Sequence, residues 1–113
     1  MSKTYLCIQR SAPGGSPGLS PAQMEAIYSK FHNWKEKFQD NIVDLGGMLG
    51  DGRVVREEGA TDGPFVESKE VIGGYMIIKA ETMEKAVQVA HESPGVHAGS
   101  SVEVREIVIP DHD

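Results

Sequence analysis

Hydrophobic and polar residues alternate with a period of two in several stretches, which predicts strands. Residues 72–79 are apolar on both faces, which is typical of a central strand covered on both sides. Residues 53–57 form the second expected strand, and residues 102–109 the last, where a change of phase near Arg105 indicates a bulge. The first expected strand, residues 4–10, places two sets of side chains on opposite faces: Leu6 and Ile8 against Tyr5, Cys7 and Gln9.

A spacing of three and four residues between apolar positions predicts a long helix over residues 21–45. Ser20 provides a capping hydroxyl, Pro21 suits the first helical position, and Gly46-Gly47 is the expected end. A shorter helix begins after Thr82 and ends before Ser93-Pro94-Gly95. The apolar stripe of the long helix consists of Met24, Ile27, Tyr28, Phe31, Trp34, Phe38, Ile42 and Leu45.

The expected order is strand-helix-strand, repeated once, in a single domain spanning residues 1–113. This order is typical of the ferredoxin-like βαββαβ fold, an α+β architecture with a four-stranded antiparallel sheet and two helices on one face. The other face of the sheet is left open, although apolar side chains of residues 72–79 point toward it. We therefore expect a homodimer that forms through the open sheet face.

Composition excludes several classes of function. The net charge of -6 argues against a nucleic-acid or anionic-membrane surface, which needs clustered Lys and Arg. No apolar run is long enough to span a membrane, and one cysteine, Cys7, forms no internal disulfide. A cytoplasmic protein is expected, in which Cys7 acts as a small buried hydrophobic residue.

Motif spacing gives no reason to expect a metal or a cofactor. HxH, HExxH and CxxC patterns are absent from the sequence. Gly14-Gly15 lacks the GK[ST] ending of a phosphate-binding loop, and no nucleophile elbow supports a serine-based triad.

The candidate site is centred on Asp62, which opens the segment Asp62-Gly63-Pro64-Phe65. A carboxylate before Gly-Pro either satisfies its own turn or serves as a general base. His32, on the flank of the helical stripe, is the candidate partner of Asp62. Lys35, placed by the long-helix prediction toward the apolar face, or Arg53 would clamp an anion, and Tyr75 is a further candidate substrate contact.

Several motifs resemble the YCII-related family, and within it the branch of DGPF-domain proteins. They are Asp62-Gly63-Pro64-Phe65, Glu67, Lys69-Glu70, Gly73-Gly74-Tyr75, Pro94-Gly95 and Val102-Glu103-Val104-Arg105. The resemblance covers nearly the whole chain and implies a dimeric α/β barrel in a bacterial cytoplasm. It implies a His-Asp pair at a cleft, with Asp62 as the counterpart of the acid and His32 as the histidine on the first helix.

Two functions from different classes remain open. The first is a small-molecule enzyme that performs proton transfer, elimination or isomerisation on a small organic acid or ring compound, because the superfamily includes isomerases, dehydrohalogenases and monooxygenases. The second is a non-catalytic dimeric module that binds a metabolite or a regulatory partner, because some members of the branch are associated functionally with sigma factors. An enclosed pocket onto which Asp62 and His32 converge would favour the enzyme.

Overall fold

The computed structural model describes residues 2–11, 20–50, 52–62, 71–96 and 99–110, with the backbone alone at residues 61, 62 and 71. Within them the chain forms, in order, β1 (Lys3–Ser11), α1 (Pro21–Lys37), β2 (Ile42–Met48), β3 (Arg53–Arg56), β4 (Gly59–Asp62), β5 (Val71–Ala80), α2 (Met83–His91) and β6 (Ser100–Glu106).

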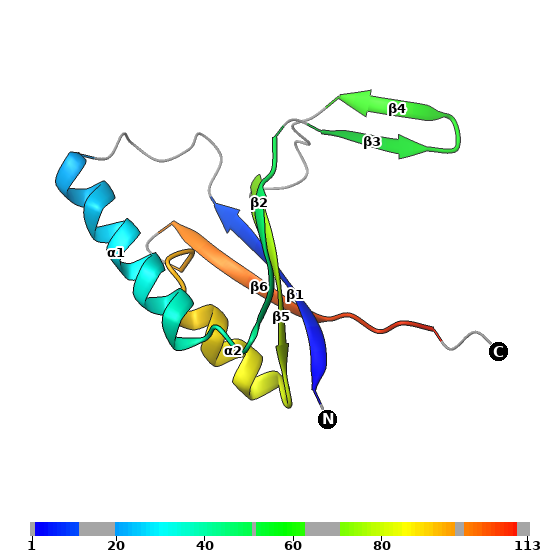
Figure 1. The fold of residues 1–113 in the computed structure, drawn as a ribbon. Coiled ribbons are helices and arrows are strands. Elements are labelled where there is room, and N and C mark those ends of the chain that lie inside the picture. Colours follow the sequence, from blue (N-terminus) through cyan, green and yellow to red (C-terminus); the bar gives the residue numbers. More distant parts are fainter. Residues whose placement is uncertain (1, 12–19, 51, 63–70, 97–98, 111–113) are drawn as a thin grey trace.

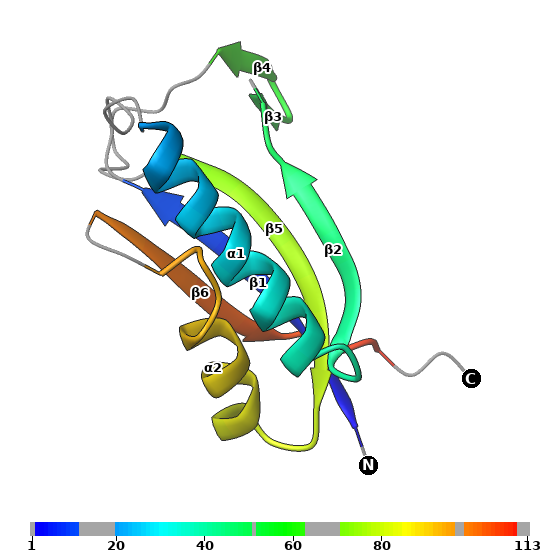
Figure 2. The ribbon, with the colours of Figure 1, turned by 60° about the vertical axis from the view of Figure 1, so that its left-hand side comes forward.

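The main sheet has four antiparallel strands in the order β2-β5-β1-β6. Both helices lie on one face of it (Figures 1 and 2), which is the ferredoxin-like arrangement expected from the sequence. The prediction that the doubly apolar strand is central is confirmed, since β5 lies between β2 and β1. None of the helices in the described residues is long and apolar enough to cross a membrane.

The core lies between the two helices and the sheet. Tyr5 and Ile78 are buried on the sheet, and Val89 of α2 covers them. Trp34 joins the two helices, because its indole Nε1–H donates a hydrogen bond to the carbonyl oxygen of Val89 at 2.8 Å. Phe38 completes this core. Trp34 and Phe38 therefore have the core role that helical spacing predicts, whereas Tyr28 and Phe31, on the same expected stripe, are 64% and 37% exposed.

The prediction that the first helix extends to Leu45 is wrong, because α1 ends at Lys37 and Ile42–Met48 is strand β2. Phe38 caps the helix, and Asn41 then fixes a turn: its side chain donates to the carbonyl of Lys79 at 2.9 Å. Ile42 and Leu45 continue the helical spacing by coincidence, whereas the β-branched pair Ile42-Val43 suits a strand.

Gly46 stands in a bulge of β2 and does not end a helix. Its φ is +68°, and its N–H donates a hydrogen bond to Oδ1 of Asp44 at 2.8 Å. The pairing of β2 with β5 shifts register on both sides of Asp44. A glycine in the left-handed region is the usual solution at such a bulge.

The sequence predicts that residues 53–57 form the second strand of the main sheet, and this prediction is wrong. β3 pairs with β4 in a separate two-stranded sheet, and in the described residues neither strand joins the other four. The two strands, residues 53–62, form a ribbon that extends away from the helices (Figure 1), and we call it the β3–β4 arm. The turn of this hairpin, at Glu57-Glu58, is polar and charged and has no Asn-Gly or Asp-Gly pair. The sequence therefore lacks the usual signal of a hairpin there.

The last strand is shorter than expected and has no bulge at Arg105. β6 ends at Glu106, and the N–H of Ile107 donates to the carbonyl of Thr4 at 2.8 Å as the chain leaves the sheet. The change of phase in the sequence therefore marks the end of the strand. β1 and β6 pair in continuous register from Tyr5 to Ser11.

Burial of Cys7 predicts a pH-dependent stability. Desolvation raises the pKa of its thiol from 9.0 to about 11, so the folded chain keeps a proton that the unfolded chain loses above pH 9. The stabilisation is complete below that pH and is lost as the pH rises toward 11, by about 3 kcal/mol at most. Urea unfolding between pH 8 and 10.5 should show a steeper fall for the native chain than for Cys7→Ala; equal slopes would contradict it.

Candidate functional site

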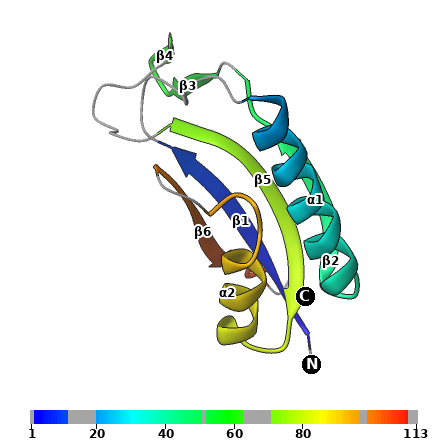
Figure 3. The same ribbon diagram turned by 90° about the vertical axis from the view of Figure 1, so that its left-hand side faces the viewer.

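The face of α1 toward the sheet is packed at only one end. Trp34 and Phe38, in the C-terminal half and the cap, are 4% and 2% exposed. Phe31, Ile27 and Met24 lie on the same side of the helix, yet 37–41% of each remains exposed. The N-terminal half of α1 therefore presents accessible apolar side chains, and Figure 3 shows this half running along the sheet toward its upper end.

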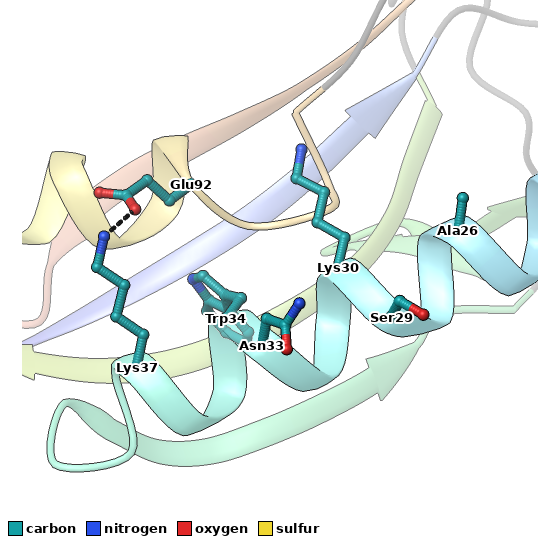
Figure 4. A pocket seen from close by; sticks show the side chains of 7 residues that line it. All are labelled: Ala26, Ser29, Lys30, Asn33, Trp34, Lys37 and Glu92. Carbon is teal, nitrogen blue, oxygen red and sulfur yellow. Dashed lines mark hydrogen bonds and ion pairs between the residues drawn. The ribbon is translucent and has the colours of Figure 1, made fainter.

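A groove of about 500 Å³ lies between α1 and the C-terminal end of α2 (Figure 4). Its side chains on α1 recur at helical spacing on the flank that faces α2, with Trp34 between them. The capping box of Ser20 and Gln23 and the Trp34 hydrogen bond hold this flank in place. The lining residues are Ala26, Ser29, Lys30, Asn33, Trp34, Lys37 and Glu92.

The groove carries more positive than negative charge. Lys37 donates to Glu92 at 2.6 Å across the two helices. The bond from Lys37, then that from Gln88, lowers the pKa of Glu92 below its ordinary value, so this carboxylate stays ionised. Lys30 projects into the groove (Figure 4) and has no ion-pair partner within the described part of the chain. One ammonium is therefore left to attract an anion.

The structure places His32 on the outer side of α1. It lies two residues from Trp34, which is about 160° around the helix axis. Its side chain is 70% exposed, and its Nε2 lies 3.3 Å from Oε1 of Glu36, one turn further along. Lys35, the candidate anion clamp, is also exposed, about 100° around the axis from Trp34. With α1 ending at Lys37, it lies at the edge of the apolar stripe and not in the middle.

Asp62 is described through its backbone only. It ends β4, opposite Arg53 of β3 in the register of the arm. Within one chain this register brings Asp62 and Arg53 together, whereas the arm and α1 lie on opposite sides of the sheet (Figure 1). His32 is on α1, so its backbone lies on the other side of the sheet from the arm that carries Asp62. Residues 63–70, with Glu67 and the Lys69-Glu70 pair, lie outside the described residues.

Tyr75 lies on the face of the sheet that the helices leave uncovered. Alternation along β5 puts Met76 and Ile78 toward the helices and Tyr75 and Ile77 toward the other side. The side chain of Tyr75 is thus separated by the sheet from α1 and from the groove. No three His, Cys, Asp or Glu side chains gather into a metal-binding group among the residues described.

Comparison with known proteins gives the family. The model of the YCII-related domain matches residues 4–109. The chain belongs to the YCII-related family. Among solved structures, the chain is similar to 5-chloro-2-hydroxyhydroquinone dehydrochlorinase (TftG) from Burkholderia phenoliruptrix AC1100, in a complex with 2,5-dihydroxybenzoquinone. That similarity has 20% identity and a TM-score of 0.46, and it covers 88% of this chain and 90% of that chain. A comparison with curated proteins finds no match.

Two features of this YCII-related domain were missed in the sequence. The first is the flank of α1 that lines the groove. Its signal in the sequence is the spacing of three and four residues between Lys30, Asn33 and Lys37, whereas the predictions for this helix were based on its apolar stripe. The second feature is Gln9, a half-buried amide on the helix-facing side of β1 whose Nε2 donates to Ser100 at 3.4 Å. Its signal in the sequence is a polar side chain on the same face of β1 as the buried Tyr5 and Cys7.

Proposed function

We propose that this YCII-related protein binds a small organic acid, or a ring compound with an anionic group, in the groove between α1 and α2. The observation that carries the proposal is that the indole of Trp34 and the ammonium of Lys30, which has no ion-pair partner among the described residues, line the same groove of suitable size. Ligand sites combine an apolar surface with a few polar groups that fix orientation, and about 300–1,000 Å³ is typical.

The groove supplies each contact that such a ligand needs. Lys30 and Lys37 would bind a carboxylate, Asn33 offers a neutral donor, and the indole of Trp34 provides an apolar wall. Because the whole chain carries a charge of -6, this local excess of lysine is the feature that would draw an anion here.

Lys30→Glu is expected to weaken binding of a small aromatic acid by about tenfold or more, since it replaces an attraction by a repulsion. Trp34 is the sole tryptophan of the chain, so its fluorescence reports binding directly. A titration with benzoate and with 2,5-dihydroxybenzoquinone would measure the affinity. Lys35→Glu makes the same change of charge on the other flank of α1; a loss confined to that variant would move the anion to the site predicted from the sequence.

A second candidate is proton-transfer, elimination or isomerisation chemistry that uses Asp62. It is supported by the register of the arm, which sets Arg53 opposite Asp62 and so combines an acid with an anion-binding cation. Asp62 would act as the general base and Arg53 as the clamp, with Tyr75 as a further substrate contact. Lys35, which is on α1, would contact the substrate only from another copy. His32 would join them only from another copy, because its own helix lies across the sheet. The segment that follows Asp62 also supports membership of the DGPF branch.

Asp62→Asn separates the two candidates. It removes a proton acceptor while keeping the size of the side chain, so turnover of a ring compound should fall by about 100-fold or more if Asp62 is the base. NMR of the reaction mixture would measure turnover, and the Trp34 fluorescence would measure binding in the groove. Unchanged turnover in the variant would leave Asp62 without a catalytic role.

We also infer that the protein is a homodimer that forms through the uncovered face of the sheet. Four apolar side chains support it: Leu6, Ile8, Tyr75 and Ile77 lie on this face, where Tyr75 is 37% exposed and the other three are only half-buried. A face of this kind is normally buried by a second layer. Sedimentation that shows only monomer at micromolar concentration would contradict the homodimer.

A further inference from the structure

The β3–β4 arm pairs with no strand of the main sheet among the described residues. It forms its own two-stranded sheet, and Figure 1 shows it extending from the upper end of β2 to the side away from the helices. The radius of gyration is 16.0 Å, whereas a compact chain of this length would have about 13 Å. One copy is therefore more extended than a compact chain of the same length.

A two-stranded ribbon of this length is marginally stable by itself in water. The arm nevertheless exposes apolar side chains to solvent, where polar side chains are expected. Val55, in the middle of β3, is 78% exposed, and Met48 and Leu49 at the base of the arm are 93% and 45% exposed. Burial of these side chains against another surface would supply the stabilisation that the hairpin lacks.

The C-terminal segment leaves the sheet on the same side as the arm (Figure 1). It starts at the hydrogen bond between Ile107 and Thr4, and its next two residues, Val108 and Ile109, are 75% and 79% exposed. The arm and this segment thus project past opposite ends of the uncovered face. Together they frame a space with an apolar floor.

We propose that a second copy of this chain occupies that space and that the β3–β4 arm of each copy clasps the other. This proposal rests on the homodimer of the proposed function and adds the element that holds it. Two-fold pairing is favoured because each chain supplies both the uncovered face and the extensions that would cover it, so two copies satisfy each other.

The charges on the uncovered face suit a second copy. Glu103 of β6 accepts hydrogen bonds from Arg10, at 2.8 Å, and from Arg105. The bond from Arg105, with the charge of Arg10, lowers the pKa of Glu103 and keeps it ionised. The chain as a whole carries -6, whereas Arg10, Glu103 and Arg105 on this face sum to +1, so two like faces can approach without strong repulsion.

Val55→Glu tests the clasp, because an exposed position tolerates the change within one copy. Sedimentation equilibrium should show a dimer dissociation constant raised by about tenfold or more. Val87→Glu on α2 is the matched control: Val87 is 49% exposed on the helix side, away from the uncovered face, and should leave the constant unchanged. A constant within about twofold of the native one in Val55→Glu, or a native chain that is monomeric, would overturn the proposal.

A second measurement is independent of affinity. A photo-crosslinking residue at position 55, in a mixture of ¹⁴N- and ¹⁵N-labelled copies, should give products of mixed mass joined to β1, β5 or residues 107–110. Crosslinks confined to single copies would overturn the clasp. Ligand binding in the groove is measured separately, through Trp34 fluorescence. If the clasp is absent but the ligand still binds, only the dimer proposal fails.

Discussion

Gly46→Ala is expected to destabilise the protein by on the order of 4 kcal/mol or more, which is a large part of a typical domain stability of about 5–15 kcal/mol. A Cβ at Gly46 would meet the backbone carbonyl oxygen and carbon of Tyr75 at 1.9 and 2.7 Å, and its φ of +68° is unfavourable for alanine. Because the obstacle is the backbone of β5, relief requires the two strands to separate.

Gly47→Ala is the matched control for Gly46→Ala. A Cβ at Gly47 would meet nothing within 4 Å, and its φ is outside the left-handed region, so the free energy of unfolding should fall by less than about 1 kcal/mol. Urea unfolding followed by Trp34 fluorescence compares the two variants. Similar midpoints would show that the bulge of β2 relaxes without cost.

Ile78→Ala is expected to cost about 2–5 kcal/mol, because it leaves a cavity where the core is closed from both sides. Ile78 is 0% exposed on β5 and packs with Tyr5 and Val89 beneath the helices. The measurement is again the free energy of unfolding in urea.

Ile72→Ala makes the same change near the other end of β5, where the side chain is 44% exposed. It should cost less than about 1 kcal/mol, since little packing is lost. If the two variants were equally destabilised, the core would be distributed along the whole strand and not concentrated near α2.

Most of the fold could be predicted from local patterns. The two faces of β1, the central position of β5 and the caps of both helices follow from alternation, apolar content, Ser20 and Thr82. The end of α1 could not, because Ile42 and Leu45 keep a helical spacing through the turn. The hydrogen bonds that fix that turn join Asn41 to Lys79, which is 38 residues away, and no local pattern contains them.

The candidate site was harder to predict than the fold. Arg53 and Asp62 are nine residues apart, and their pairing depends on a hairpin whose turn has no strong signal. His32 was assigned by residue type and by family resemblance, whereas helical geometry directs it to solvent beside Glu36. The groove needed the position of α2, which determines the flank of α1 that Lys30 and Trp34 share with it.

The support of α1 at one end has a consequence for its motion. With Trp34 and Phe38 fastened and Met24, Ile27 and Phe31 accessible, local opening should begin at Pro21 and stop near Trp34. Amide hydrogens of the first turns should exchange with solvent faster than those around Trp34, in a gradient along one continuous helix. The N-terminal half of α1 should then move relative to the sheet while the C-terminal half stays fixed, and the distance between this half and the sheet should vary.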